Sequence, residues 1–227
     1  MKKHINKSEY TKVLLLRTIG NFLVLSSIFL IAKTFYLPVR EEVRYFVDKL
    51  NHKQYVVSQD LPQKKGALAA AFQAGQVQIL TPQDSNFDII IPKFGANSRI
   101  IPNVNASNEN EYLAALKTGV AHTLGTSFPG ENGHIFLFAH STDYFWNVGT
   151  YNAVFYLLYK LERGDEIDLF YRGQRYVYTV IGKQNVDPSQ VEFLTRKSNK
   201  EFLTLQTCWP PGTTLQRLLV FATRKAQ

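Results

Sequence analysis

The chain is poor in cysteine and in charge and lacks repeated or glycine-rich motifs, and each shortage excludes a class of protein. Its 227 residues include one cysteine, which excludes an intramolecular disulfide and any metal site built from several cysteines. Charged residues make up 19% and hydrophobic residues 45%, which excludes a disordered tail and a protein with many membrane spans. The sequence contains no internal repeat, low-complexity tract or glycine-rich phosphate loop. Its length allows one large domain, or one of about 150 residues with additional segments.

The net charge of +8 is concentrated near the beginning of the chain. Residues 1–65 contain twelve basic and five acidic residues, whereas residues 66–227 contain fourteen and thirteen. A nucleic-acid-binding protein is expected to carry its positive charge on the folded domain. Here the excess flanks a hydrophobic segment instead, so the basic composition indicates a membrane topology and no nucleic-acid partner.

The hydrophobic segment covers residues 13–37 and contains two charged residues, Arg17 and Lys33. The uncharged stretch between them, 18–32, is shorter than the roughly 20 residues that cross a bilayer, but both long cationic side chains can reach the interface and extend the span. Four lysines precede the segment, which predicts a cytoplasmic N-terminus. A cleaved signal peptide is the alternative, although no small-residue cleavage motif follows Ala32.

These features predict four successive regions. They are a basic cytoplasmic N-terminus at 1–12, a transmembrane signal anchor at 13–37, a juxtamembrane stalk at 38–84 and an extracellular domain at 85–227. Within the stalk, residues 39–57 carry charges on both sides of an apolar set, which predicts a short amphipathic helix. Residues 60–85 combine proline and glycine with an alanine-rich patch, and the sequence leaves open a stalk or a helix packed on the domain edge.

Short β-type runs separated by turns follow from residue 88 onward. The expected strands are 87–94, 134–140, 166–172, 174–183, 201–208 and 217–224, with a tight hairpin around Gly173. Helical patterns cover 111–120 and 152–161. Because few long helices separate the strands, the pattern predicts a closed, mixed β-barrel of seven or eight strands.

Cys208 is the first candidate for chemistry, because it ends an apolar strand and enters a Trp-Pro-Pro-Gly loop that cannot continue a sheet. Such a strand end exposes a side chain at a domain rim. An inert buried cysteine is the commoner case, and the spacing alone does not decide between the two.

A histidine close to a thiol can stabilise the thiolate and later transfer a proton. His140 lies where a strand gives way to a loop, whereas His122 and His134 lie beside glycines in turns and are interpreted as structural. The two remaining histidines, His4 and His52, precede the domain and are not expected to reach Cys208.

Arg217 opens the apolar strand that follows Cys208. It is either a surface cation at a strand end or a fixed donor that binds a substrate carbonyl or a developing oxyanion. Composition alone leaves both interpretations open.

Four ordered motifs resemble those of sortases. The run TLQTC at 204–208, followed by Pro, Gly and RLLV at 217–220, resembles the family signature TLxTC…R. Upstream, LKTGVAH at 116–122, GT at 125–126 and PGENG at 129–133 are similar to the family's LxxGVxH…GT…PGExGN stretch. FAH at 138–140 resembles the strand with the catalytic histidine, and LERGD at 161–165 resembles the LxxGD turn. The resemblance covers about residues 88–224.

The chain departs from the family pattern next to the predicted site. Ala139 and Ser141 flank His140 where the family usually has Gly before and often Arg after, and Trp209 follows the cysteine where small or polar residues are common. These departures leave open the subclass and the substrate motif.

The resemblance implies a mainly β fold, a closed eight-stranded barrel with short helices behind one N-terminal transmembrane helix. It implies a cysteine transpeptidase in which Cys208 is the nucleophile, His140 the general acid and base, and Arg217 the donor to the oxyanion or substrate carbonyl. Thr207 and Trp209, on either side of the nucleophile, are expected to contact the substrate.

The partners implied by the resemblance are secreted proteins with a C-terminal sorting signal such as Leu-Pro-x-Thr-Gly, and an amine on a cell-wall precursor or a pilin. No cofactor is expected, since the thioester conserves the energy of the peptide bond. Some sortases bind calcium, but this sequence contains no compact cluster of carboxylates that would predict a calcium site. Two alternatives stay open, an extracellular cysteine peptidase that only hydrolyses and a catalytically silent, membrane-tethered β-barrel scaffold.

Overall fold

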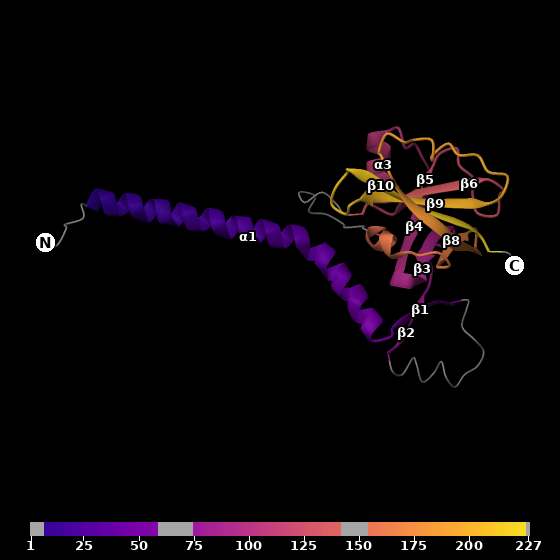
Figure 1. Ribbon diagram of the computed structural model, residues 1–227, viewed down its shortest axis with the longest axis horizontal. Coiled ribbons are helices and arrows are strands. Elements are labelled where there is room, and N and C mark those ends of the chain that lie inside the picture. Colours follow the sequence, from indigo (N-terminus) through magenta and orange to yellow (C-terminus); the bar gives the residue numbers. More distant parts are fainter. Residues whose placement is uncertain (1–6, 59–74, 142–153, 226–227) are drawn as a thin grey trace. The chain divides into compact units, whose positions relative to one another are not determined.

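The computed structural model describes residues 7–58, 75–141 and 154–225 (Figure 1). The chain divides into two compact units, Met1–Arg40 and Glu41–Gln227. One helix, α1, runs from Lys7 to Leu50 and therefore contributes to both.

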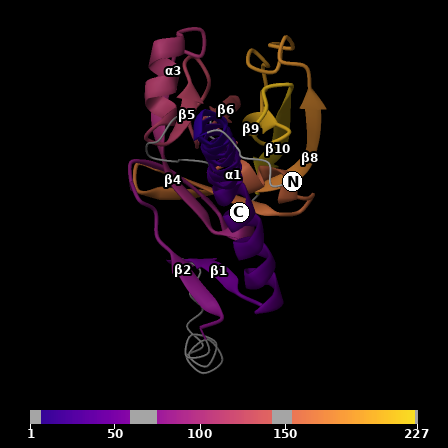
Figure 2. The ribbon, with the colours of Figure 1, turned by 90° about the vertical axis from the view of Figure 1, so that its left-hand side faces the viewer.

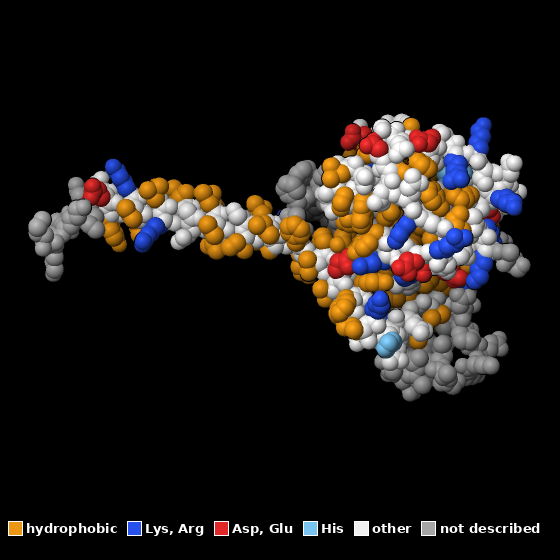
Figure 3. Space-filling model, viewed as in Figure 1, with side chains coloured by type: hydrophobic (Ala, Val, Ile, Leu, Met, Phe, Trp, Pro, Cys, Tyr) orange, Lys and Arg blue, Asp and Glu red, His pale blue; other side chains and the backbone are white. Residues whose placement is uncertain are grey.

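The first unit consists of the N-terminal part of α1. Its segment Ser8–Lys33 has 26 residues, a mean hydropathy of 2.0 and no buried part, so by length and composition it can cross a membrane. Hydrophobic side chains cover its surface in Figure 3. The hydroxyls of Thr18 and Ser27 donate to the carbonyls of Leu14 and Leu23, which satisfies these polar groups within the helix.

Eight strands of the second unit close into a barrel in the order β10-β8-β7-β3-β4-β5-β6-β9, which confirms the predicted fold class. The pairs β4–β5 and β6–β9 are parallel and the other pairs are antiparallel. The strands are β3 Phe87–Ile91, β4 Ala96–Val104, β5 Val120–Thr123, β6 His134–Phe138, β7 Glu166–Tyr171, β8 Gln174–Val186, β9 Phe202–Trp209 and β10 Gln216–Arg224.

Two further strands, β1 Gln54–Val57 and β2 Val77–Leu80, form a separate parallel pair. Val57 and Leu80 of this pair pack on Ile90 of β3 and Phe170 of β7. Strand β3 is thereby buried on both faces, which accounts for its three consecutive isoleucines at 89–91. The pair β1–β2 and helix α3, Glu109–Leu116, lie at opposite ends of the barrel (Figures 1 and 2).

Strand β3 ends earlier than the expected 87–94, because proline and glycine follow it. Pro92 starts a short 3-10 helix, η2, at Pro92–Phe94, and Gly95 ends it with a φ of 67°. A β-carbon at Gly95 would lie 2.5 Å from the ring of Tyr55, so glycine is required there for packing as well as for its backbone angle.

The expected helices differ from the observed ones in position and type. Helix α3 begins after Asn108, whose side chain accepts a hydrogen bond from the Glu111 N–H, and ends before Gly119. The sequence pattern predicted a helix over 111–120, but residues 117–119 form a turn and strand β5 begins at Val120. Within 152–161 the structure describes a 3-10 helix, η3, at Tyr156–Lys160.

The remaining boundaries follow local signals. The hairpin between β7 and β8 turns through Arg172 and Gly173, with φ of 51° and 78°, which confirms the predicted tight turn. The amphipathic helix expected at 39–57 ends at Leu50, and β1 follows it. Within the segment 60–85, residues 60–74 lie outside the described residues, and 77–80 form strand β2 instead of the helix that the sequence left open.

Candidate functional site

The C-terminal ends of β6 and β9 and the beginning of β10 lie side by side in the barrel. In the antiparallel register of β9 and β10, Arg217 is directly opposite Cys208. In the parallel register of β6 and β9, Phe138 pairs with Gln206. His140 lies two residues after Phe138, just past the end of β6, and Cys208 lies two residues after Gln206. If the register is extended by these two residues, His140 is level with Cys208. The strand pairing therefore gathers Cys208, His140 and Arg217 at one edge of the barrel.

The alternation of side chains along β9 separates this site from the core. Leu203 and Leu205 are fully buried in the hydrophobic core, whereas Gln206 and Cys208 belong to the other face of the strand. Arg217 is on the same face as Cys208, because directly paired residues share a face. Cys208, His140 and Arg217 are all half-buried.

Two hydrogen bonds hold the residue before His140 against β9. The Ala139 N–H donates to the Gln206 carbonyl at 3.1 Å. The Thr207 hydroxyl donates back to the Ala139 carbonyl at 3.0 Å. The backbone leading into His140 is thus fixed by the residue next to the nucleophile. Thr207 itself is buried, and its contact with a substrate stays a prediction.

Burial and a nearby cation act in opposite directions on the Cys208 thiol. Burial raises its pKa, because a thiolate loses solvation there, and the positive charge of Arg217 lowers the pKa in part. The guanidinium is oriented by its own loop, since its Nη1 donates to the carbonyls of Thr214 and Gln216, each at 3.2 Å. Arg217 is therefore placed to stabilise negative charge next to Cys208.

His122 and His134 are buried in the barrel wall. The Asn103 N–H donates to His122 Nδ1 at 3.2 Å, so Nε2 carries the proton and donates to the Ser127 carbonyl at 3.1 Å. His134 Nε2 pairs with the Thr204 hydroxyl at 2.8 Å. Burial lowers the pKa of His122 and lowers the pKa of His134 to about 4, so both rings are neutral at neutral pH. These contacts suit structural roles.

The described residues contain no group of three or more His, Cys, Asp or Glu side chains arranged to hold a metal ion. The cluster at this edge of the barrel has instead a thiol, an imidazole and a guanidinium, a set suited to nucleophilic attack, proton transfer and anion binding.

A family model described as a sortase domain matches residues 89–225, more than half of the chain. The chain belongs to the sortase family. It is 28% identical to sortase D of Bacillus subtilis (strain 168) over 174 residues, which are 73% of this chain and 83% of that protein. It is 30% identical to a crystal structure of sortase C1 from Streptococcus agalactiae, with a TM-score of 0.51 over 62% of this chain and 67% of the other.

A lid mutant of sortase A from Corynebacterium diphtheriae shares the fold at 22% identity, with a TM-score of 0.51 over 84% of this chain and 96% of that one. Sortases are cysteine transpeptidases that act on sorting signals or pilins, and this chain has the family's barrel. Its apolar N-terminal helix is consistent with membrane anchoring.

One group of residues beside the site lies outside the motifs that the sequence analysis identified. The ring of Trp209 lies 5.3 Å from that of Tyr159, measured between centroids. The Tyr159 hydroxyl donates to Glu42 of α1, and Lys160 Nζ lies 3.2 Å from the same carboxylate. Glu42 and Tyr159 are 117 residues apart, so no local sequence pattern could have indicated their contact.

Proposed function

We propose that this sortase is a membrane-anchored transpeptidase in which Cys208, His140 and Arg217 perform the reaction. The observation that supports it most is the strand register, in which Arg217 is directly opposite Cys208 and His140 is level with both. Each of the three has a distinct task in acyl transfer through a thioester.

In the first half-reaction, the Cys208 thiolate attacks the carbonyl of the scissile peptide bond in a C-terminal sorting signal of the Leu-Pro-x-Thr-Gly type. The bond to the leaving amine breaks as the thioester forms, and His140, as imidazolium, gives that amine its proton. In the second, His140 takes a proton from the incoming amine, which attacks the thioester and releases Cys208. Atoms and charge balance without a cofactor.

Arg217 donates hydrogen bonds to the oxyanion that forms during each attack, or holds the substrate carbonyl before it. Preorganised donors of this kind act where negative charge develops. The two carbonyl contacts of its Nη1 hold the guanidinium in place, and its positive charge acts on Cys208, which supports this assignment. Trp209 is proposed to contact the substrate next to the nucleophile.

The proposed substrates are secreted proteins with a C-terminal sorting signal, and the proposed acceptor is an amine of a cell-wall precursor or a pilin. The protein would cross the membrane once, with its N-terminus in the cytoplasm and the catalytic domain outside. The basic residues around the apolar part of α1 support this orientation.

The test uses the full chain in detergent micelles with a library of sorting-signal peptides and an added primary amine. Mass spectrometry should find the peptide's N-terminal part joined to the amine, and Cys208→Ala should form neither this product nor a covalent intermediate. Hydrolysed peptide without amine conjugate would identify a cysteine peptidase instead. If no reactive peptide analogue labels Cys208, the barrel is a scaffold and the proposal is wrong.

A further inference from the structure

The last turns of α1 carry an apolar stripe on the surface of the second unit. We define this apolar stripe as Val43, Phe46, Val47 and Leu50, whose side chains are exposed by 53%, 61%, 42% and 61%. Their spacing of three and four residues places them on one face, about 100° wide. Hydrophobic side chains are visible on the surface of this part of α1 in Figure 3.

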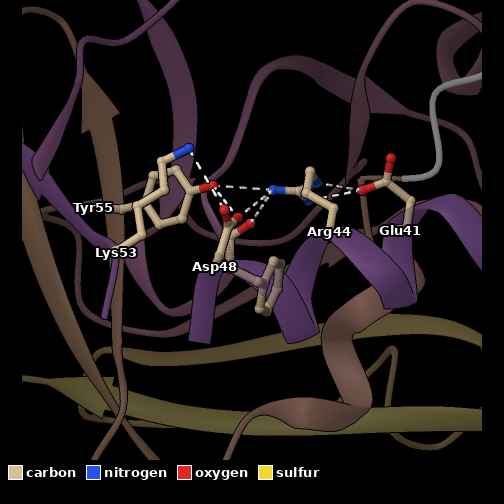
Figure 4. A network of polar contacts seen from close by, with 6 residues as sticks. Glu41, Arg44, Asp48, Lys53 and Tyr55 are labelled. Atoms are coloured by element: carbon tan, nitrogen blue, oxygen red, sulfur yellow. Dashed lines mark hydrogen bonds and ion pairs between the residues drawn. The ribbon is translucent and has the colours of Figure 1, made fainter. Parts of the chain in front are cut away.

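The opposite face of the same turns is attached to the barrel by polar contacts (Figure 4). Arg44 Nη1 donates to the Phe94 carbonyl and to the Tyr55 hydroxyl, both at 3.2 Å. The Tyr55 hydroxyl in turn donates to Asp48 of α1 at 2.6 Å. Glu42, also on this helix, accepts from Tyr159. These contacts fix the rotation of the helix, so the apolar stripe cannot turn toward the core.

Charged residues, among them the cations Arg40 and Lys49, border the apolar stripe. At about 100° per residue, Arg40 falls next to Val47 on one margin of the face. On the other margin Glu42, whose carboxylate is paired with Lys160, falls next to Phe46, and Lys49 falls just beyond it. An exposed apolar face with cations along its edges is typical of helices that lie in a membrane interface, where the cations meet anionic headgroups.

The same helix contains the candidate membrane span, which ends at Lys33, ten residues before Val43. Pro38 lies between the two parts and lacks the N–H of a regular helix position, so the two parts need not share one axis. We propose that the apolar stripe lies in the interface of the membrane that α1 crosses, with the opposite face bound to the barrel. This proposal rests on the membrane anchoring put forward above, and it adds a second lipid contact that holds the catalytic unit.

The test places one nitroxide label at a time in the full chain, reconstituted in vesicles of phosphatidylcholine with a minority of phosphatidylglycerol. Cys208→Ala removes the natural thiol, and Val43→Cys or Phe46→Cys then supplies the only attachment site. Val191→Cys is the matched control, because Val191 is exposed to a similar extent, 58%, in the connection between β8 and β9. Leu23→Cys reports on the span itself.

The readout is the collision rate of each label with oxygen, which concentrates in lipid, and with a nickel chelate, which stays in water. Positions 43 and 46 should show several-fold lower nickel collisions and higher oxygen collisions than position 191. Equal nickel collisions at 43, 46 and 191 would overturn the proposal, since the apolar stripe would then be in water. Low collisions with both reagents would overturn it too, because the apolar stripe would be covered by protein.

The label at position 23 separates this proposal from the membrane anchoring on which it rests. Lipid-like values at 23 together with water-like values at 43 and 46 would refute the interfacial contact and leave the anchor intact. Water-like values at 23 would refute the anchor, and with it both proposals.

Discussion

At the scale of single residues, the reactivity of Cys208 depends on the balance between burial and the charge of Arg217. Burial raises the pKa of the thiol more than the charge of the guanidinium lowers it. The same guanidinium is proposed to bind the oxyanion. Its charge and its geometry therefore have separate effects, which two substitutions can distinguish.

Arg217→Lys keeps the cation and loses the planar set of donors, whereas Arg217→Gln loses the cation as well. In Arg217→Lys, we expect iodoacetamide to alkylate Cys208 at close to the wild-type rate, while the rate of peptide transfer falls about 100- to 1000-fold. In Arg217→Gln the pKa of Cys208 should rise further, so the midpoint of the alkylation rate against pH should move upward. Alkylation and transfer rates measured across pH check both effects. Near-wild-type transfer in Arg217→Lys would falsify the oxyanion role.

Replacing single histidines tests the assignment of the acid and base. His140→Ala should abolish peptide transfer, because no other described histidine is level with Cys208. His134→Ala should retain transfer and instead lower the free energy of unfolding by about 1–3 kcal/mol, since a buried ring and its bond to Thr204 are lost. Peptide transfer and denaturant titration of both variants provide the measurements. The opposite pattern, with His134 essential, would mean that the assignment is wrong.

At the scale of elements, the end of α1 and the helix η3 support the residue next to the nucleophile. The Glu42 carboxylate accepts from the Tyr159 hydroxyl, and the Tyr159 ring packs against Trp209. Lys183 of β8 also bonds the main chain here, donating to the Leu161 carbonyl at 2.8 Å. The last turns of α1 thus contact one wall of the proposed site.

Tyr159→Phe removes the hydroxyl that binds Glu42 and keeps the ring. Because one hydrogen bond contributes about 0.5–1.5 kcal/mol, we expect KM for the peptide to rise about 2- to 10-fold while alkylation of Cys208 is unchanged. In a Trp146→Phe background, which leaves Trp209 as the remaining tryptophan, its fluorescence should shift as well. Glu41→Gln is the control, since Glu41 pairs with Arg44 on the same helix. Equal effects of both variants would indicate general loosening of α1.

At the scale of the whole molecule, the barrel buries ionisable groups that make its stability depend on pH. Asp88 on β3 is fully buried, and its Oδ2 accepts the N–H groups of Gln83 and Asp84 at 3.1 and 3.2 Å. Burial outweighs these bonds and raises the pKa of Asp88 to about 7. In the unfolded chain this carboxyl ionises near its ordinary value, so only the unfolded state releases the proton between about pH 4 and 7.

The Asp88 carboxyl should therefore cost stability as the pH rises through this window. Asp88→Asn removes the titration, so the free energy of unfolding of the variant, relative to wild type, should increase from pH 4 to pH 7 by a few kcal/mol. Urea titrations of both proteins at a series of pH values measure this difference. If the difference stays constant with pH, the pKa of Asp88 is not raised in the folded protein.

The orientation of the whole chain is tested in intact protoplasts. The basic residues before the span predict that added protease digests the domain after Pro38 and spares the first dozen residues. Antibodies against tags at the two ends would follow each part. Protection of the C-terminal domain would contradict the extracellular site and the proposed sorting of secreted proteins.

The sequence by itself determined the features that depend on neighbouring residues. Runs of apolar residues predicted the hydrophobic span and six of the barrel strands, and breaks in those runs located Cys208, His140 and Arg217 at strand ends. The sequence pattern did not predict strands β4 and β5. Polar residues interrupt β4, and β5 is only four residues long. Their strand character follows from pairing with neighbours in the closed barrel.

Only the tertiary structure decided which strand ends meet. Ala139 and Thr207 are 68 residues apart, and the closed barrel makes their strands neighbours and sets the register that brings His140 level with Cys208. The contact between Glu42 and Tyr159 has the same origin. Local periodicity indicates which face of a segment is apolar. Which strands become neighbours depends on the closure of the whole sheet, because each strand must form hydrogen bonds along both of its edges.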